Sequence, residues 1–402
     1  MTARGTRRVR LADVGPTVFT RMSELAARHG AINLGQGFPD TPGPEHAVES
    51  AVAALRAGYH QYPPVPGLFE LRRAVADHQR AQYGIDLDPA TEVVVTTGAS
   101  EALAAALLAL TGPGDEVVVL EPYYDAYAAC VALAGATLVP VRLTTPGFTL
   151  DPAVLRAAVT ARTKVLLLNT PHNPTGTVLP PESLRQIAET ARAHDLLVIA
   201  DEVYEHLVFE GPPHQPVAAL PGMAERTLTV GSAGKTFSFT GWKVGWATGP
   251  RELVEAVTAV KQYLSLGSGT PFQYAVVDAL RLLPGHLAEL RDSLRRRRDL
   301  LVTGLNAAGL IAHVPRGTYF VTADISPLGE PDGLAFCRSL PARCGVAAIP
   351  NQVFYADPQA GRHFVRFAFC KRRAVLEEAV ARLATLRQTR PVPTLRTEGT
   401  NA

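Results

Sequence analysis

Between residues 92 and 202 the sequence alternates short apolar, β-branched runs with helical patterns. The run EVVVTTG precedes the helical pattern SEALAAALLAL, and the same order recurs as far as the run LLVIADE. Such runs are typical of strands buried on both faces, and the helices between them are the crossovers that parallel strands need. The segment therefore predicts an α/β fold with a mainly parallel central sheet and helices on both of its faces.

Two further strand-like runs, RTLTVGS and VGWATGP, lie on either side of a loop that contains Lys235 and Lys243. In open α/β sheets, ligands bind on loops beyond the carboxyl ends of the strands. Only five of the 39 basic residues are lysines, so two lysines eight positions apart on such a loop indicate a chemical role. We therefore expect a site built from strand ends that are distant in sequence.

The chain length of 402 residues suits two domains. The βα alternation predicts a large domain over residues 46–284. After it, a long helical pattern and the short runs TYFVTAD, VAAIP and HFVRFAF predict a smaller α+β domain, formed by residues 1–45 and 285–388. The remaining segment, 389–402, is expected to be a disordered tail.

The charge distribution excludes several classes of protein. The formal net charge is +2 and no basic stripe with interleaved aromatic residues is present, so nucleic acid is not an expected partner. No segment has the ~18 to 20 apolar residues of a membrane span, and a cytoplasmic location is expected. The run from Arg295 to Arg298 lies in a helical pattern and is interpreted as a solvated helix face rather than a phosphate site.

The four cysteines are far apart in the sequence. There is no C-x-x-C pair, and no histidines have the spacing of zinc ligands, so we expect reduced cysteines and no metal site. The glycines of NLGQGFPD resemble part of a dinucleotide-binding fingerprint, but the third glycine is missing and three prolines follow. A nicotinamide oxidoreductase is therefore a weak alternative.

Five motifs occur in one order along nearly the whole chain: NLGQGFPD with HQYPP, PHNPTG, DEVYEHL, SAGKTF with GWKVGW, and VRFAF. In this order they resemble the class I and II aminotransferases, pyridoxal-phosphate enzymes of fold type I. The closest resemblance is to the group that contains kynurenine, glutamine, methionine and N-succinyldiaminopimelate aminotransferases. The resemblance implies an enzyme that moves the amino group of an L-amino acid to a 2-oxo acid.

The resemblance implies catalytic roles for three residues. Lys235 would form a Schiff base with pyridoxal 5′-phosphate and move the substrate proton, which an arginine cannot do at neutral pH. Asp201 would keep the pyridine nitrogen protonated. Tyr204, together with Asn173, would hydrogen-bond the phenolic oxygen of the cofactor.

Other implied roles concern cofactor and substrate contacts. The phosphate would be held at a helix start and by nearby polar side chains, namely Gly98, Ala99, Ser100, Ser232 and Lys243. Tyr124 would stack on the pyridine ring, and Tyr62 would reach the phosphate of a partner subunit, which implies a homodimer with shared active sites. The implied substrate contacts are Asn173, Phe19, Gly37 and Arg366, of which Arg366 would take the α-carboxylate.

The substrate itself stays open. N-succinyldiaminopimelate is our leading prediction from the resemblance, but no second arginine is assigned to a side-chain carboxylate. A pyridoxal-phosphate-dependent β-lyase that acts on cysteine conjugates shares the first chemical steps. A non-catalytic regulator built on the same domain is an alternative of a different class, although no helix-turn-helix spacing precedes residue 46.

Overall fold

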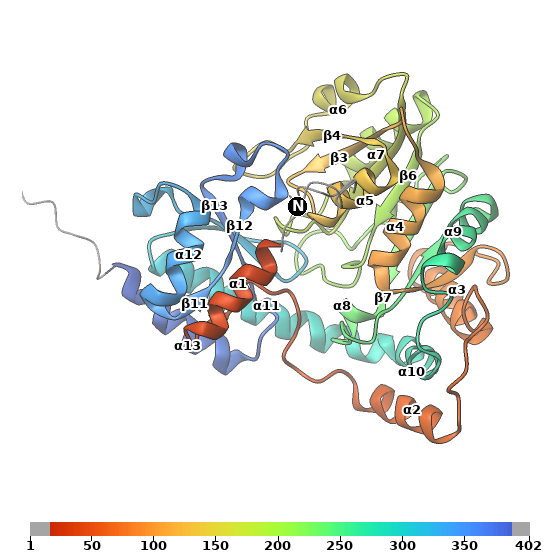
Figure 1. Ribbon diagram of the computed structural model, residues 1–402, viewed down its shortest axis with the longest axis horizontal. Helices are drawn as coiled ribbons and strands as arrows, with labels where there is room; N and C mark the ends of the chain where they lie inside the picture. Colours follow the sequence, from red (N-terminus) through yellow and green to blue (C-terminus); the bar gives the residue numbers. More distant parts are fainter. Residues whose placement is uncertain (1–16, 388–402) are drawn as a thin grey trace, which may run out of the picture.

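The computed structural model describes residues 17–387 of the chain (Figure 1). The segment 389–402, predicted to be disordered, lies outside the described residues, as does the beginning of the predicted small domain. The described part contains a seven-stranded sheet, a four-stranded sheet and a two-stranded sheet, with helices packed around them.

The seven-stranded sheet has the order β2-β8-β7-β6-β5-β3-β4. Its strands are β2 (Val93–Thr97), β3 (Glu116–Glu121), β4 (Thr137–Arg142), β5 (Thr163–Asn169), β6 (Leu197–Asp201), β7 (Thr227–Ser232) and β8 (Val244–Thr248). The strand β8 runs antiparallel to its neighbours β2 and β7, and the pairs from β7 to β4 are parallel. The mainly parallel α/β sheet predicted from the alternation is therefore confirmed.

Side chains alternate between the two faces of this sheet. On β3, Val117 and Val119 belong to one core cluster and Val118 and Leu120 to another. The helices that follow or flank the strands are α3 (Phe69–Tyr83), α4 (Gly98–Leu110), α5 (Ala126–Ala134), α6 (Pro152–Ala158), α7 (Pro181–Ala193), α9 (Arg251–Leu264) and α10 (Thr270–Arg281). Helices α4, α5 and α9 supply the first cluster, whereas α6 and α7 supply the second, so both faces are covered.

The four-stranded sheet is antiparallel and has the order β12-β13-β10-β9. The elements of this region are α1 (Val18–Arg28), β1 (Ile32–Asn33), α11 (Leu283–Ala307), β9 (Ile311–His313), β10 (Phe320–Asp324), α12 (Gly333–Cys344), β11 (Val346–Ala347), β12 (Ile349–Pro350), β13 (Phe364–Ala368) and α13 (Arg373–Leu383). The predicted run VAAIP is divided between β11, which pairs with β1, and β12, which pairs with β13. The division into domains at residues 45 and 284 stays a prediction; the second boundary falls in the first turn of α11.

The run from Arg295 to Arg298 is only partly the solvated face that we predicted. Arg295 and Arg296 are exposed, but Arg298 is buried. It lies four residues after the buried Leu294 on α11, where its guanidinium forms an ion pair with Glu210 at 2.7 Å and packs over an aromatic ring. A buried arginine needs such partners, and they come from a loop that is distant in sequence.

No helix within residues 17–387 is long and apolar enough to cross a membrane.

All four cysteines are free. Cys370 is buried, and burial raises the pKa of its thiol to about 11, which keeps it in the unreactive thiol form at neutral pH. The glycines of NLGQGFPD do not open a helix, because α2 (Glu45–Arg56) begins only after Pro44.

Candidate active site

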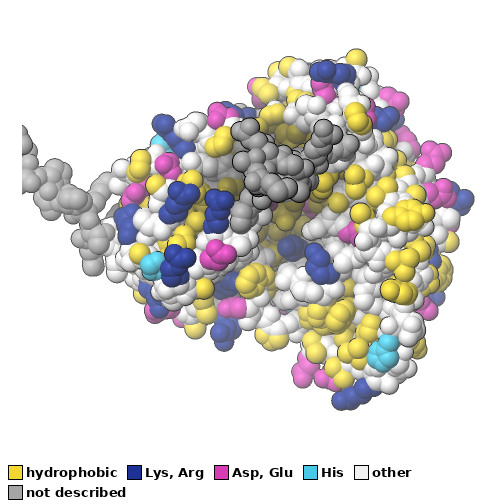
Figure 2. All heavy atoms as spheres, viewed as in Figure 1, with side chains coloured by type: hydrophobic (Ala, Val, Ile, Leu, Met, Phe, Trp, Pro, Cys, Tyr) yellow, Lys and Arg dark blue, Asp and Glu magenta, His cyan; other side chains and the backbone are white. Residues whose placement is uncertain are grey.

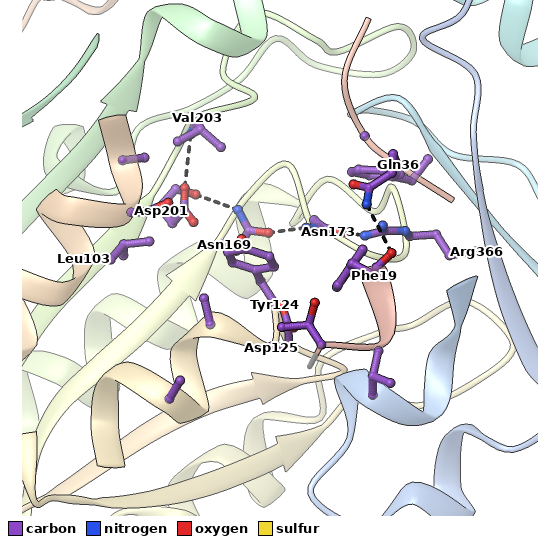
Figure 3. Close-up of a pocket in the computed structure, with 18 of the residues that line it drawn as sticks. Phe19, Gln36, Leu103, Tyr124, Asp125, Asn169, Asn173, Asp201, Val203 and Arg366 are labelled. Atoms are coloured by element: carbon purple, nitrogen blue, oxygen red, sulfur yellow. Dashed lines mark hydrogen bonds between the residues drawn. The ribbon is translucent and has the colours of Figure 1, made fainter. Parts of the chain in front are cut away.

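A cavity of about 930 Å³ lies at the carboxyl ends of β5 and β6 (Figure 3). Its walls are formed by the seven-stranded and four-stranded sheets, by α1 and α4, and by the loop before α5. Ten of the residues singled out from the sequence line it: Phe19, Gly37, Ala99, Ser100, Tyr124, Asn173, Asp201, Tyr204, Lys235 and Arg366. Strand ends distant in sequence therefore do meet in one place.

Asp201 is the last residue of β6, and its side chain is buried at the cavity wall. The hydroxyl of Tyr127 donates a hydrogen bond of 2.5 Å to its carboxylate, and the backbone N–H of Val203 donates a second at 3.4 Å. Burial raises the pKa of Asp201 to about 6, although the Tyr127 hydroxyl opposes this shift. Asp201 is therefore a buried acid that a cationic partner would keep ionised.

A chain of hydrogen bonds joins Asp201 to Arg366 (Figure 3). The Asn169 amide donates to the backbone oxygen of Asp201 at 2.9 Å and accepts from the backbone N–H of Asn173 at 2.7 Å. The side-chain oxygen of Asn173 accepts from Arg366 at 2.7 Å. The positions of the acid and of the guanidinium are thus fixed relative to each other.

Arg366 lies on β13 with only 2% of its surface exposed. Its guanidinium donates to Asn173 and to the backbone oxygen of Gly35, and it lies 4.0 Å from the centre of the Phe320 ring. Among residues 17–387 no carboxylate forms an ion pair with it, and its Nε has no hydrogen-bond partner. Burial lowers its pKa to about 10, so it stays cationic at neutral pH. A buried cation with free N–H donors at a cavity is suited to binding an anion.

Lys235 lies in the short helix α8 (Ala233–Thr236), directly after β7. Its ammonium nitrogen is 5.8 Å from the centre of the Tyr204 ring. Burial lowers the pKa of Lys235, an effect that Cys370 and Asp201 oppose and the cations Arg366 and Lys243 reinforce. A lowered pKa increases the fraction of neutral amine, which is the nucleophilic form of lysine.

A smaller cavity of about 80 Å³ adjoins Lys235 on the side of the α4 amino terminus. Five of the residues predicted to contact phosphate line it: Gly98, Ala99, Ser100, Ser232 and Lys243. Gly98 has φ +72° and lies against Lys243, since a Cβ atom added there would be 3.4 Å from the Lys243 ammonium. The start of a helix, two hydroxyls and an ammonium group form a cup suited to a phosphate.

The backbone of Lys243 has φ 56°, a conformation that non-glycine residues seldom adopt. Such conformations persist where the surrounding structure holds them, and they are frequent at functional sites. The Ser232 hydroxyl accepts from the backbone N–H of Gly234 at 3.1 Å, so it caps α8 as well as facing the cup. Its own proton remains available to an anion.

The remaining predicted residues differ in their placement. Tyr204 is buried and meets Tyr319 edge to face, and the Tyr319 hydroxyl donates to the Gly37 oxygen at 2.6 Å. A Cβ atom on Gly37 would lie 2.4 Å from a ring atom of Phe320, so a residue with a side chain would clash at this position. Tyr62 is 81% exposed and lines neither cavity, so within one chain it is separate from the site.

Several residues at the site were missed in the sequence, among them four with polar side chains. Tyr127 and Asn169 make the hydrogen bonds described above, while Asp125 and Arg21 line the large cavity. Tyr127 lies three residues after Tyr124, in the first turn of α5, and this second tyrosine in the motif EPYYDAY is a signal that could have identified it. Nothing in the local sequence around Arg21 distinguishes it from the other arginines.

The arrangement of strands and the position of the cavity define the class of the protein: it is an enzyme of fold type I. The chain belongs to the family of class I and II aminotransferases, whose sequence profile, "Aminotransferase class I and II", matches residues 29–383. Enzymes of this family depend on pyridoxal phosphate. The resemblance seen in the motifs is therefore confirmed, and the protein is an aminotransferase.

Individual relatives agree with this assignment. The chain is 53% identical over 388 residues to a probable N-succinyldiaminopimelate aminotransferase of Mycobacterium tuberculosis, with 94% of this chain and 98% of the relative covered. It is 41% identical to a methionine aminotransferase of Escherichia coli, with 94% and 97% covered. The solved structure of the N-succinyldiaminopimelate aminotransferase from M. tuberculosis superposes with a TM-score of 0.92, covering 94% of this chain and 99% of that one.

Proposed function

We propose that this aminotransferase binds pyridoxal 5′-phosphate through Lys235 and acts on an amino acid that has a second anionic group. The observation that supports the site is the meeting of Lys235, Asp201 and Arg366 at one cavity. An amine for covalent attachment, a buried acid and a buried cation are the three groups that transfer of an amino group from an α-amino acid requires. Because the chain is an aminotransferase by family, we set aside the two other predicted classes, a nicotinamide oxidoreductase and a non-catalytic regulator.

The residues present fit the cofactor. When bound, pyridoxal phosphate supplies an electron sink for the negative charge that develops at the substrate Cα. Lys235 would anchor it and move the Cα proton, and Asp201 would hold a proton on its ring nitrogen. The cup formed by Gly98, Ser232 and Lys243 would bind the phosphate. Arg366 would bind the substrate α-carboxylate through its free N–H groups.

Arg21 supports a substrate with a second carboxylate. It lies on α1, lines the large cavity and is exposed. Within the described part of the chain it forms no ion pair, so its guanidinium is available to a ligand. N-succinyldiaminopimelate has carboxylates beyond its α-carboxylate, and a relative 53% identical to this chain has the name of an aminotransferase for that compound. It is therefore our leading candidate for the amino donor.

Arg21→Gln is expected to raise the KM for N-succinyldiaminopimelate about tenfold, because a charge-assisted hydrogen bond of roughly 1.4 kcal/mol is lost. The KM for methionine, which has no second carboxylate, should not change. Arg366→Lys serves as the comparison, since it should weaken both donors. Both KM values are measured with saturating pyruvate as acceptor, because pyruvate has no second carboxylate for Arg21 to bind. If Arg21→Gln weakened methionine equally, or left both donors unaffected, the role given to Arg21 would be wrong.

The same assays test the β-lyase alternative. Transamination consumes one 2-oxo acid for each amino donor, whereas β-elimination from a cysteine conjugate releases ammonia and needs no acceptor. Release of ammonia from conjugates faster than transfer to 2-oxoglutarate from any amino acid would favour the lyase. We expect transfer to dominate.

We also propose a homodimer in which Tyr62 completes the site of the partner subunit. The support is its 81% exposure, because a tyrosine that stays so accessible is available for a contact between chains. Other large apolar side chains are exposed in the same region, among them Tyr59, Phe69, Tyr263 and Leu264. Figure 2 shows hydrophobic side chains gathered on the side of the molecule where α3, α9 and α10 lie. Such a surface is typical of a face covered by another chain.

Mixing Lys235→Ala and Tyr62→Ala subunits is expected to restore activity. In a mixed dimer with two-fold symmetry, one site has both defects and the other has neither. Random reassortment makes half of the dimers mixed, so about a quarter of all sites should be intact. The two variants are refolded together and their activity is compared with the mean of the separate preparations. No gain, with mixed dimers shown by mass spectrometry, would place Tyr62 in its own subunit or outside the site.

A further inference from the structure

Outside the catalytic cavity, three buried side chains converge on one point. His78 comes from α3, and Glu205 and His206 follow β6; their exposed fractions are 7%, 4% and 3%. The Nε2 atoms of the two histidines are 3.2 Å apart, and the Glu205 Oε2 atom lies 3.5 Å from His78 Nε2 and 4.0 Å from His206 Nε2. None of the three residues lines the catalytic cavity.

Two of these separations, 3.2 and 3.5 Å, are close to those of ligand atoms around one metal ion, and the third, 4.0 Å, is longer. Zinc binds histidine nitrogen and carboxylate oxygen at about 2.0–2.2 Å in tetrahedral geometry, which places ligand atoms roughly 3.3–3.5 Å apart. Two histidines and one carboxylate form a donor set that zinc and other divalent transition metals accept. Three protein ligands leave a fourth position for water.

The hydrogen bonds within the cluster are incomplete. Glu205 Oε2 is buried and has no hydrogen-bond partner, since His78 Nε2, at 3.5 Å, is at the outer limit for such a bond. The two Nε2 atoms can share only one proton in the contact between them. A buried carboxylate oxygen without a partner is costly, and a cation between the three atoms would pair with all of them.

Neighbouring groups fix the orientation of the proposed ligands. His206 Nδ1 lies 2.9 Å from the Thr236 hydroxyl, and the His206 backbone oxygen accepts from Arg291 at 2.7 Å. With Nδ1 occupied in this way, the lone pair on Nε2 can point toward the cluster. Tyr83 packs edge-on against the His78 ring. Hydrogen bonds such as the one between His206 and Thr236 hold metal ligands in place in known sites.

One of the three side chains also borders a second cavity. A cavity of about 390 Å³ between α3 and α10 has His78 in its wall. Two acidic residues, Glu70 and Asp77, and two basic residues, Arg73 and Arg281, line the same cavity, so their charges balance.

We propose that His78, Glu205 and His206 form a structural binding site for a divalent transition-metal ion, with zinc as the best fit. No sequence pattern indicated this site, because His78 and His206 are 128 residues apart, far from the spacing of a local zinc motif. The ion would join α3 to the segment that follows Asp201 and Tyr204. Through Thr236 it would also support the residue next to Lys235.

The test uses the full-length, cofactor-loaded enzyme without a histidine tag, freed of metal by a chelator. Titration with Co²⁺ should show one ion per chain and the visible absorption of tetrahedral cobalt. Zn²⁺ should displace the cobalt and raise the melting temperature by about 2 °C or more at a hundredfold excess over its Kd. His78→Gln should lose the absorption and the rise in melting temperature, whereas His46→Gln, at an exposed position on α2, should keep both.

Glu205→Gln is a second variant, in case His78→Gln does not fold. It removes the charge but retains the shape, so the Co²⁺ affinity should fall at least about tenfold while the far-ultraviolet circular dichroism is unchanged. Binding that persists unchanged in either folded variant would overturn the proposal. So would the absence of cobalt absorption in the parent enzyme, which would mean that the cluster is held together by hydrogen bonds alone.

Discussion

Lys235→Ala is expected to lower transamination by at least about four orders of magnitude, because the variant lacks both the covalent anchor and the base that moves the substrate proton. Lys235→Arg should be as inactive, since a guanidinium keeps the charge but supplies neither function at neutral pH. Single-turnover rates with saturating amino donor measure the loss. The two variants together separate the chemistry of the amine from its charge.

Chemical labelling gives an independent test of the same assignment. Borohydride reduction of the parent enzyme followed by peptide mapping should place the cofactor on Lys235. The other lysines provide the controls within one experiment. Lys261, for example, is buried but donates to the backbone oxygens of Val65 and Leu266 at 2.8 and 2.6 Å, so its amine is not available. Label on Lys164, Lys243, Lys261 or Lys371 in place of Lys235 would contradict the proposal.

The environment of Lys235 gives this prediction a pH dependence. Burial lowers the pKa of the Lys235 ammonium below its ordinary value of 10.5, so the neutral amine becomes available at lower pH than for an exposed lysine. Capture of pyridoxal phosphate by the cofactor-free enzyme should therefore accelerate as the pH rises and level off below pH 10.5. Free lysine is the reference for this experiment, because it also reacts with the cofactor as the neutral amine.

The parallel sheet could be predicted from the sequence because its signal is local. Buried strands such as β3 and β6 are continuous apolar runs, and the helices between them have their own periodicity. The two-residue strand β1 and the short strand β9 were not predicted. Two or three residues give no periodicity, and these strands form only because β11 and β10 lie beside them.

In the candidate site, too, some residues could be predicted from local motifs, whereas contacts between distant segments could not. Lys235, Asp201 and Arg366 lie in motifs that can be read along the chain. By contrast, the hydrogen bond from Tyr127 to Asp201 and the meeting of His78 with His206 join segments 74 and 128 residues apart. Such contacts depend on the packing of helices against the sheet, which no local pattern encodes. The burial of Arg298, which we predicted to be solvated, has the same cause.

Asp201→Asn is the second substitution with a large expected effect: activity should fall by about three orders of magnitude or more while the fold is retained. A neutral amide cannot hold the proton on the pyridine nitrogen strongly, so the negative charge developing at the substrate Cα loses its stabilisation. Asparagine has nearly the same shape and can still accept the hydrogen bond from Tyr127. The loss should therefore appear in kcat more than in the substrate KM.

Stability measurements distinguish this loss from misfolding. Burial raises the pKa of Asp201 from 3.8 to about 6, so in the cofactor-free protein the cost of ionising this buried carboxyl group opposes folding at neutral pH. The destabilisation is absent below about pH 4, develops between pH 4 and 6, and is complete at pH 7. Asparagine does not ionise, and cofactor-free Asp201→Asn should melt at pH 7 no lower than the parent.

Tyr127→Phe is the matched control for Asp201→Asn, because it removes the 2.5 Å hydrogen bond but keeps the carboxylate. That hydrogen bond lowers the pKa of Asp201, so its loss should raise the pKa further and move the acidic limb of the kcat/KM profile to higher pH. Activity at pH 8 should change much less than in Asp201→Asn, since the charge is still present there. If Asp201→Asn turned over at a near-normal rate, or if Tyr127→Phe were equally inactive at pH 8, the charge of Asp201 would not be what the reaction requires.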